Sequence, residues 1–428
     1  MAAALDARRV VAAYGEDYGT RYFKYGPLME RKPRIMESVG LFLEDSPLLR
    51  EVYGIDKKLV VDYSEVMRYL GAKEMLVRNL IYPLKDGEIK REDERSWMVV
   101  TELTRKGLKQ FEDYKKKEGF EGFYVTAAIA ARAPEYMVEK LLEVHAKIDR
   151  ETGLVKAFTV IAQPLAVAIA EKELTCVVVE SGHGNTQITP INSYPIREAI
   201  ISLYRGGAEA DAVAAEVLKD LGYGDLASDE KAVRRFKEEA GLVPLDLDRA
   251  VRAARENPQK FSCRVKLSPL LEIDLEDRGW YRFLIGEVVF NPRHEIYESY
   301  KKRGVLNIRP TVVGDRTIEG DVPLSDAILQ SISETPVGIH ELLLKKVILS
   351  GGNFQWRVPE ELKGVAVSAR EKVEHMLRAR GLSVEVRMTE DPQSSVWKGC
   401  VVWSLALPDS YLWDENRGEG WFKRGVHY

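Results

Sequence analysis

Residues 174–191, LTCVVVESGHGNTQITPI, predict a strand, a tight glycine turn and a returning strand. Cys176 to Val179 form a short apolar run, mostly β-branched, which is typical of a buried strand. Glu180 stands at the expected end of that strand. Ser181 to Gly184 then turn the chain back into Thr186 to Ile191. Glycines let backbone amides approach a ligand closely, and successive turn amides form a concavity that suits phosphate.

The carboxylate of Glu180 lies at the mouth of this predicted turn. It would repel a phosphate unless a cation lay between them, so the arrangement points to a magnesium-bound nucleotide. The alternative is a β-hairpin with a surface acid, and the stretch by itself favours that alternative.

A second copy of the pattern lies near the N-terminus. Residues 9–13, RVVAA, predict a strand that leads to Glu16 and Asp17. Residues 19–26, GTRYFKYG, supply a glycine turn with a hydroxyl residue and a returning strand. Two such hairpins in separate halves of the chain predict a duplicated domain that grips one phosphate chain from both sides.

A third segment ends in a glycine pair. Lys346 to Ser350, KVILS, predict a buried strand that runs into Gly351 and Gly352, and Asn353 to Trp356 follow. The three pieces, in this order and with this spacing, resemble the nucleotide site of the actin superfamily.

Two further segments support the resemblance. Ser395 to Ser404, SVWKGCVVWS, are similar to the actin segment that returns the chain to the first domain. Tyr82 to Lys90, YPLKDGEIK, are similar to the segment that follows the small outer subdomain. The resemblance covers nearly the whole chain and is greatest to the archaeal actins called crenactins.

The resemblance implies a fold with a duplicated core. This is the α/β actin-like ATPase fold, in which ribonuclease H-like domains form two lobes around a nucleotide cleft, with four subdomains. The implied boundaries are 1–27, 82–171 and 392–428 for the first large lobe, 28–81 for its small outer subdomain, 172–206 and 289–391 for the second large lobe, and 207–288 for its small outer subdomain.

The resemblance also implies a catalytic set of Gln163, Glu180 and Asp17 with ATP or ADP and Mg²⁺ as cofactors. Asp17 and Glu180 would hold the metal through its waters, since Mg²⁺ dehydrates reluctantly. Lys24 would supply a point charge for the β- and γ-phosphates. Gln163 would orient the attacking water, because phosphoryl transfer needs positioning and charge neutralisation more than a strong base.

Further nucleotide contacts are implied in the two turns, in one helix and at the glycine pair. Lys237 and Glu238 fall where actins contact ribose and adenine, although such a pair on an amphipathic helix otherwise indicates a solvated face. The implied contacts are Gly19, Thr20, Arg21, Lys24, Ser181, Gly182, His183, Gly184, Asn185, Gly207, Lys237, Glu238, Gly351, Gly352, Asn353 and Trp356.

Three residues depart from the actin pattern. Actins carry Asp at Glu180, Asp at His183 and His at Gln187. The extra methylene moves the Glu180 carboxylate by about 1.5 Å, the length of one C–C bond. We expect these changes to retune the hydrolytic step without abolishing it, because Gln163, Asp17 and Lys24 remain.

Residues 291–324 form a longer loop than actin has at this place, and 304–314, GVLNIRPTVVG, are apolar and β-rich. Long structured loops inside compact domains are usually functional. The loop either folds back on its own domain or inserts into a neighbouring subunit, and insertion is the favoured interpretation. The segment 28–81 allows two interpretations. Its apolar residues mark a contact with another molecule if they are exposed, and they form a small core if they are buried. They are Leu48, Leu49, Val52, Leu59, Val60 and Val61.

Other segments read as helices and strands in alternation. Helices are predicted over 92–118, 134–148, 164–171 (opened by Gln163), 208–257 and 325–332, and strands over 123–128 and 158–161. Residues 186–204 are expected to finish the second hairpin and start a helix that Gly206 and Gly207 break.

The composition excludes several classes of protein. A net charge of −4 over 428 residues argues against a protein that coats nucleic acid. Cys176, Cys263 and Cys400 are odd in number and far apart, so neither a disulfide framework nor a zinc site is expected. The start, MAAALDARRVV, lacks the apolar segment of a secretory signal, and no apolar run approaches the roughly 20 residues that span a bilayer. A cytoplasmic protein is expected.

The function implied by the resemblance is cytoskeletal. ATP-bound subunits would assemble head to tail into filaments, with the 291–324 loop and the 28–81 subdomain as candidate contacts between copies. Slow ATP hydrolysis would time those contacts. The alternatives are a non-filamentous actin-related subunit of a complex and, less favoured, a small-molecule kinase, for which the sequence offers no further carboxylate base.

Overall fold

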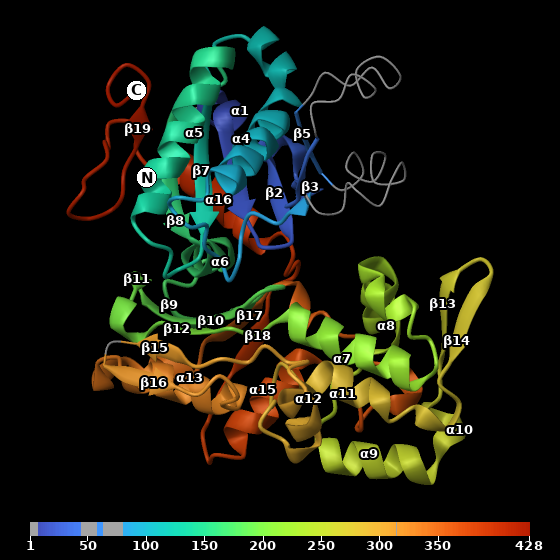
Figure 1. Ribbon diagram of the computed structural model, residues 1–428. Helices are drawn as coiled ribbons and strands as arrows, with labels where there is room; N and C mark the ends of the chain where they lie inside the picture. Colours follow the sequence, from blue (N-terminus) through green and yellow to red (C-terminus); the bar gives the residue numbers. More distant parts are fainter. Residues whose placement is uncertain (1–6, 44–57, 63–79, 314) are drawn as a thin grey trace, which may run out of the picture. The chain divides into compact units, whose positions relative to one another are not determined.

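The computed structural model describes residues 7–43, 58–62, 80–313 and 315–428 (Figure 1). The chain divides into two compact units. Unit 1 comprises Met1–Glu173 and Ser394–Tyr428, and unit 2 comprises Leu174–Gln393. Each unit is built around its own mixed sheet, and the four-subdomain boundaries stay a prediction.

Unit 1 contains a six-stranded sheet in the order β19-β8-β7-β1-β2-β3. β1 is antiparallel to β2 and parallel to β7, and β7 is parallel to β8. The strands are β1 (Ala13–Tyr18), β2 (Tyr22–Pro27), β3 (Arg34–Glu37), β7 (Phe123–Ile129), β8 (Val155–Ala162) and β19 (Phe422–Lys423). A smaller sheet holds β4 (Gly40–Phe42), β5 (Leu59–Val61) and β6 (Leu80–Ile81).

Helices cover both faces of this sheet. They are α1 (Ala7–Ala12), α4 (Glu94–Lys109), α5 (Tyr136–Thr152), α6 (Gln163–Glu171) and α16 (Ser395–Ala406). The hydroxyls of Thr126 on β7 and Ser404 on α16 are 2.7 Å apart on one face, and Glu16 on β1 contacts His145 on α5 on the other. Figure 1 shows α4 and α5 in front of the sheet and α16 behind it.

Unit 2 contains a second sheet, β11-β10-β9-β17-β18, in which β12 also pairs with β10. Its strands are β9 (Thr175–Ser181), β10 (Thr186–Asn192), β11 (Tyr194–Pro195), β12 (Ile201–Leu203), β17 (Val347–Ser350) and β18 (Val386–Met388). Two separate hairpins are β13 (Arg264–Ser268) with β14 (Leu271–Asp274), and β15 (Thr311–Val313) with β16 (Arg316–Ile318).

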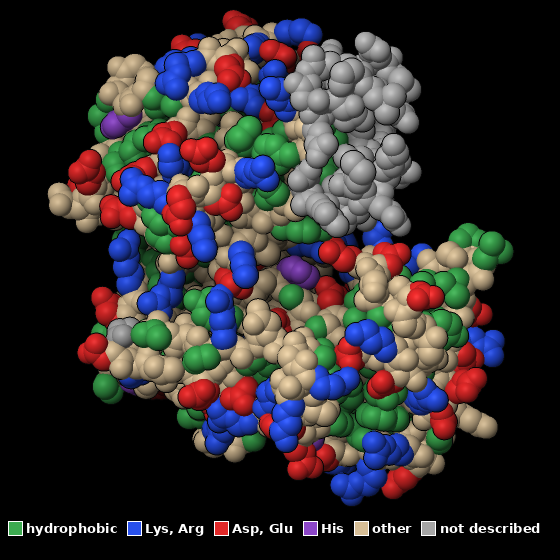
Figure 2. Space-filling view, viewed as in Figure 1, with side chains coloured by type: hydrophobic (Ala, Val, Ile, Leu, Met, Phe, Trp, Pro, Cys, Tyr) green, Lys and Arg blue, Asp and Glu red, His purple; other side chains and the backbone are tan. Residues whose placement is uncertain are grey.

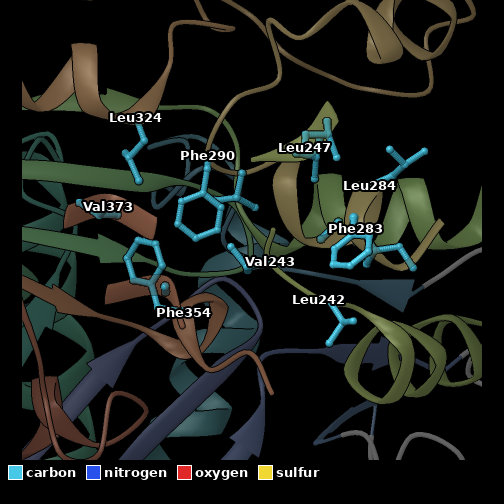
Figure 3. Packing of buried hydrophobic residues seen from close by; sticks show 14 of the residues in the cluster. Leu242, Val243, Leu247, Phe283, Leu284, Phe290, Leu324, Phe354 and Val373 are labelled. Atoms are coloured by element: carbon cyan, nitrogen blue, oxygen red, sulfur yellow. The ribbon is translucent and has the colours of Figure 1, made fainter. Parts of the chain in front are cut away.

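The helices of unit 2 pack around one large apolar core. They are α7 (Gly207–Asp220), α8 (Glu230–Ala240), α9 (Leu247–Glu256), α10 (Pro258–Phe261), α11 (Tyr281–Glu287), α12 (Glu298–Lys302), α13 (Leu324–Ser333), α14 (His340–Leu344) and α15 (Ala369–Arg378). In Figure 3 the rings of Phe290 and Phe354 lie close together in this core, and their centroids are 5.9 Å apart. A core of this kind supplies most of the free energy that holds such helices in place.

The two sheets repeat one arrangement. In each, a hairpin is extended on one side by two parallel strands: β7 and β8 follow β1, and β17 and β18 follow β9. Asp17 on β1 pairs with Lys24, and Glu180 on β9 pairs with Gln187 at the equivalent place. The predicted duplicated α/β fold is therefore confirmed.

Two predicted elements are wrong. Residues 9–13 are not a strand, because α1 occupies Ala7–Ala12 and β1 begins at Ala13. Its Arg9 donates to the carbonyl oxygens of Ser404 and Leu407, at 2.7 and 3.0 Å, and these distant partners override the β-propensity of the valines.

The second error lies after β10. Between β10 and Gly206 the chain forms β11, the short 3₁₀ turn Arg197–Ala199 and β12, and the α-helix α7 begins only at Gly207. Gly206 is the N-cap, and its backbone N–H donates to the Glu209 carboxylate at 2.7 Å. The glycines therefore start a helix rather than break one.

The long 291–324 loop folds back on its own unit. Its side chains of Tyr297, Leu306, Val313 and Ile318 are buried in the core of unit 2, while Val312 is exposed. The favoured interpretation, insertion into a neighbour, loses most of the apolar residues on which it rested.

The small outer segment is described only in part. Leu48, Leu49 and Val52 lie outside the described residues, whereas Val60 and Val61 are buried. For these two valines the small-core alternative holds.

On the face shown in Figure 2, Lys and Arg side chains lie among Asp and Glu side chains in both units. Within the described ranges, no helix is long and apolar enough to cross a membrane.

Candidate functional site

Asp17 is the central residue of the first hairpin, β1–β2. It occupies the last but one position of β1 and is 2% exposed. Its Oδ2 lies 2.7 Å from Lys24 Nζ, on the opposite strand, and its Oδ1 accepts from Gln163 Nε2 at 2.9 Å. The carboxylate is thus held between a cation and an amide.

Gln163 is the first residue of α6, directly after β8. Its Nε2 also lies 3.3 Å from the carbonyl oxygen of Tyr18. Both partners only accept hydrogen bonds, so they determine which end of the amide is the nitrogen. The oxygen Oε1 is therefore turned away from them, as an acceptor for a water proton must be.

The turn of the first hairpin begins at Gly19. Its N–H donates to the Tyr22 carbonyl at 3.1 Å, and its carbonyl accepts from the Ser38 hydroxyl at 2.9 Å. Thr20 and Arg21 lie within this turn and are partly exposed.

The second hairpin, β9–β10, repeats this turn geometry. The Gly182 N–H donates to the Asn185 carbonyl at 3.0 Å, again across three residues. Glu180 occupies the last but one position of β9, as Asp17 does in β1, and its Oε2 accepts from Gln187 Nε2 at 3.3 Å. His183 and Gly184 lie within the turn. The two carboxylates therefore have equivalent places in the repeated fold.

Ser181 belongs to a buried hydroxyl chain rather than to the open turn. Thr186 Oγ1 donates to the Arg205 carbonyl at 2.9 Å, so the Ser181 hydroxyl, 2.7 Å away, donates to Thr186. The Ser181 oxygen accepts from Asn353 Nδ2 at 3.0 Å. The side chains of Ser181 and Asn353 thus hold the end of β9 in shape.

The start of α7 is attached to the second turn. The N–H groups of Gly207 and Ala208 donate to the carbonyls of Gly182 and His183, at 3.0 and 2.8 Å. A Cβ at Gly206 would lie 2.5 Å from the Gly182 oxygen, so only glycine permits this approach. The turn and the start of the helix therefore form one hydrogen-bonded piece.

A charged cluster lies beside this piece. Asp211 on α7 is 2.7 Å from Lys237 Nζ on α8 and 3.6 Å from His183 Nδ1 in the turn. A Cβ on Gly207 would lie 3.4 Å from His183 Nδ1 and 3.6 Å from Lys237 Nζ. The structure thus brings together three of the predicted contacts, whereas Glu238 is exposed on α8.

The glycine pair follows β17. Gly351 has φ +97°, and Gly352 begins the short 3₁₀ turn Gly352–Phe354. The ring of Trp356 lies against Gly241 at the end of α8, since a Cβ there would be 2.5 Å from its Cζ3. The predicted adenosine wall is therefore next to the helix that carries Lys237.

The donors present fit a magnesium nucleotide. Among the described residues, no group of three or more His, Cys, Asp and Glu side chains is placed to hold a metal ion. Mg²⁺ is usually held by one or two carboxylates with phosphate oxygens and water, so Asp17 and Glu180 suit it without such a group. Asp17, Lys24 and Gln163 belong to unit 1, and Glu180 belongs to unit 2. Their meeting on one triphosphate stays a prediction.

The sequence reasoning missed the partners of these residues. Asp211 belongs to no recognisable sequence motif. Behind Asp17 there is also a buried cluster of Glu16, Tyr18 and His145. A signal was present, because Glu16 and Tyr18 alternate with Asp17 and so place a carboxylate on an apolar face of the strand. Burial raises the pKa of Tyr18 well above its ordinary value, and the neighbouring charge of Glu16 adds to this.

Comparisons with known proteins agree with this architecture. The actin family model matches residues 226–407. Actin-related protein 3 of Saccharomyces cerevisiae is 24% identical over 339 residues, which are 75% of this chain and 67% of the relative. Actin-related protein 3 of Schizosaccharomyces pombe is 26% identical over 239 residues, 54% of this chain and 51% of the relative.

Actin-related protein 2 of Saccharomyces cerevisiae is 25% identical over 247 residues, 55% of this chain and 56% of the relative. The chain thus spans between about half and two thirds of these curated relatives. They are eukaryotic actin-related proteins and lend no support to the narrower resemblance to crenactins. The chain has the actin-like fold, and its matches fall within the actin superfamily.

Proposed function

We propose that this protein binds ATP with Mg²⁺ and hydrolyses it slowly. One observation carries the proposal. Two hairpins with the same turn hydrogen bond each present a carboxylate at the same strand position, Asp17 in one and Glu180 in the other. A repeated carboxylate and glycine turn is suited to a metal-bound phosphate chain.

Residues of unit 1 would do most of the chemistry. Lys24 Nζ, now 2.7 Å from Asp17, supplies a positive charge to phosphate oxygens. Gln163 presents Oε1 to a water and orients it toward the γ-phosphorus, because its Nε2 is held by Asp17 and Tyr18. Bound Mg²⁺ would neutralise charge on the phosphates next to Asp17 and Glu180.

The departures from the actin pattern would adjust this site. Gln187 donates to Glu180 and so orients its longer side chain. His183 and Lys237 both face Asp211, which places an acid among two bases beside the second turn. We propose that these changes alter the hydrolysis rate and leave binding intact.

A phosphate-release assay with Mg²⁺ tests the hydrolytic role of Gln163. The Gln163→Ala variant is expected to release phosphate about 10–100-fold more slowly, since it loses the group that positions water. Gln110→Ala is the matched control, because Gln110 contacts Arg34 on the surface of unit 1. Equal rates in wild type and Gln163→Ala would remove Gln163 from the mechanism.

For the cellular role, we propose a cytoplasmic actin-related subunit that works in an assembly with other proteins. The relatives are named actin-related proteins rather than actins. In addition, the 304–313 tract, the best candidate for insertion into a second copy, packs in its own core.

A nucleotide-linked filament of this chain, as in the archaeal actins, is the second candidate. The resemblance to actin over nearly the whole chain favours it. Pelleting and light scattering with Mg-ATP or without nucleotide separate the two. A protein that stays in the supernatant under both conditions supports the subunit, and ATP-dependent pelleting overturns it in favour of the filament. A screen of hydroxyl acceptors for phosphorylation excludes or reveals a kinase.

A further inference from the structure

A buried polar cluster lies on the face of β1 opposite Asp17. Its members are Glu16 and Tyr18 on β1, Thr104 on α4 and His145 on α5. Glu16, Thr104 and His145 are 0% exposed and Tyr18 is 4% exposed. Because side chains alternate along a strand, Glu16 and Tyr18 point away from the side that carries Asp17. We call these four residues the β1 brace.

The hydrogen bonds of the Tyr18 hydroxyl and of His145 Nδ1 have defined directions. The Tyr18 hydroxyl donates to Glu16 Oε2 at 2.9 Å, and Thr104 Oγ1, 2.7 Å away, then donates to Tyr18. His145 Nδ1 lies 2.7 Å from the Leu141 carbonyl, which only accepts, so this nitrogen carries a hydrogen. The other ring nitrogen, Nε2, lies within hydrogen-bond distance of Glu16 Oε2, at 2.8 Å.

Stability alone does not account for such a cluster. Burying a carboxylate costs several kcal/mol unless partners satisfy it, and apolar side chains of similar volume often replace a buried ion pair without loss of stability. Compared with an apolar cluster of the same volume, the polar cluster fixes the orientation of its side chains, because each hydrogen bond allows only a narrow range of geometry.

The β1 brace is connected to the predicted site through the backbone of Tyr18. The side chain of Tyr18 is held by the β1 brace on one face, while its carbonyl oxygen accepts from Gln163 Nε2 at 3.3 Å. Asp17, the preceding residue, accepts from the same nitrogen at 2.9 Å. A shift of Tyr18 would therefore move both acceptors that orient Gln163.

We propose that Glu16, Tyr18, Thr104 and His145 are positioning residues that hold the end of β1 and thereby orient the Gln163 amide for hydrolysis. The proposal rests on the proposed ATP hydrolysis. None of the four touches the nucleotide in this mechanism, so they act on the rate of the chemical step and not on binding.

The Tyr18→Phe variant tests the proposal, because it removes only the hydroxyl. We expect kcat for phosphate release to fall about 5–10-fold while the Kd for Mg-ATP stays within about two-fold. Tyr14→Phe is the matched control. Tyr14 lies on the same strand and face, and its buried hydroxyl has no hydrogen-bond partner among the residues that the structure describes. Thr104→Val, which keeps the side-chain shape, replaces Tyr18→Phe if that variant does not fold.

A double-mutant cycle shows whether the effect passes through Gln163. In the Gln163→Ala background, Tyr18→Phe is expected to cause no further loss, since the group it positions is gone. Equal fold-losses in the two backgrounds would overturn the proposal, as would a wild-type rate in Tyr18→Phe.

A measurement without nucleotide gives an independent readout. In protein labelled with ¹⁵N-glutamine, the side-chain amide signal of Gln163 is identified by its loss in Gln163→Ala. Tyr18→Phe should shift this signal and Tyr14→Phe should not, and an unmoved signal in Tyr18→Phe contradicts the proposal. A wild-type protein that binds no ATP would instead refute the proposed function, so the two failures are distinguishable.

Discussion

Gly351 has a backbone conformation that other residues adopt only under strain. Its φ is +97° and its ψ is 150°, and a Cβ there would overlap the carbonyl oxygen of Ser181 on the neighbouring strand. Glycine is needed at this place both for its dihedral angles and for the close approach of β17 to β9.

The Gly351→Ala variant is therefore expected to lose about 3 kcal/mol of unfolding free energy, from strain and from displacement of the strand end. Denaturant unfolding measures this loss. Gly338→Ala is the control, because a Cβ at Gly338 would meet no atom within 4 Å. If both variants unfold at the wild-type denaturant concentration, the close contact is absent from the protein in solution.

Single residues show how far the sequence could predict the site. The sequence predicts Asp17, Lys24 and Gln163 as site residues, and the structure brings all three together. The resemblance to the actin superfamily made this possible. His145, which contacts Glu16 across 129 residues of chain, could not be predicted, since nothing local to either residue names the other.

At the scale of elements, strands with turn signals were predicted best. β9, β10 and β17 appear where β-branched runs meet glycines. The errors fall on α1 and on the start of α7, where contacts with residues distant in the sequence determine the secondary structure. Arg9 binds carbonyls at the end of α16, and Gly206 lies so close to the second turn that no side chain could be placed there. Tertiary partners override local propensity at both places.

Arg205 joins the end of β12 to the 291–324 loop. It follows β12, is 0% exposed, and donates to the carbonyls of Val289 and Gly320 at 3.1 and 2.6 Å. Burial lowers its pKa to about 9, and the guanidinium nonetheless stays charged at neutral pH. Arg205 therefore ties the 291–324 loop to the strand that precedes the α7 cap.

We expect Arg205→Met to lower the unfolding free energy by about 2–5 kcal/mol, because two buried carbonyls lose their donors. Arg91→Met should change it by about 0.5 kcal/mol or less, since Arg91 and its partner Glu139 are both exposed. Chemical denaturation of the two variants and the wild type makes the comparison. Similar losses in both would mean that water satisfies the carbonyls after substitution.

At the scale of the whole molecule, the two units differ in how the chain builds them. Unit 2 is one continuous segment, Leu174–Gln393, whereas unit 1 needs Ser394–Tyr428 to return to it. In unit 1, α16 supplies Trp397, whose Nε1 donates to the Gly26 carbonyl at 3.0 Å, and Cys400, which lies beside Glu16.

Residues 174–393 are accordingly expected to fold when produced alone, with a cooperative thermal transition and slow amide exchange in β9, β10 and β17. A chain that ends at residue 393 should keep this protection while β1, β7 and β8 exchange rapidly. Rapid exchange throughout residues 174–393 would show that its core depends on the rest of the protein.

The return of α16 sets an order of events during translation. β1 leaves the ribosome before all of unit 2, yet α16, the helix that covers one face of its sheet, is made only after unit 2. Unit 2 can meanwhile complete its core, since domains generally fold as their residues emerge. While unit 2 is being made, the apolar surface beneath α16 is therefore uncovered, which makes nascent unit 1 a natural client for chaperones.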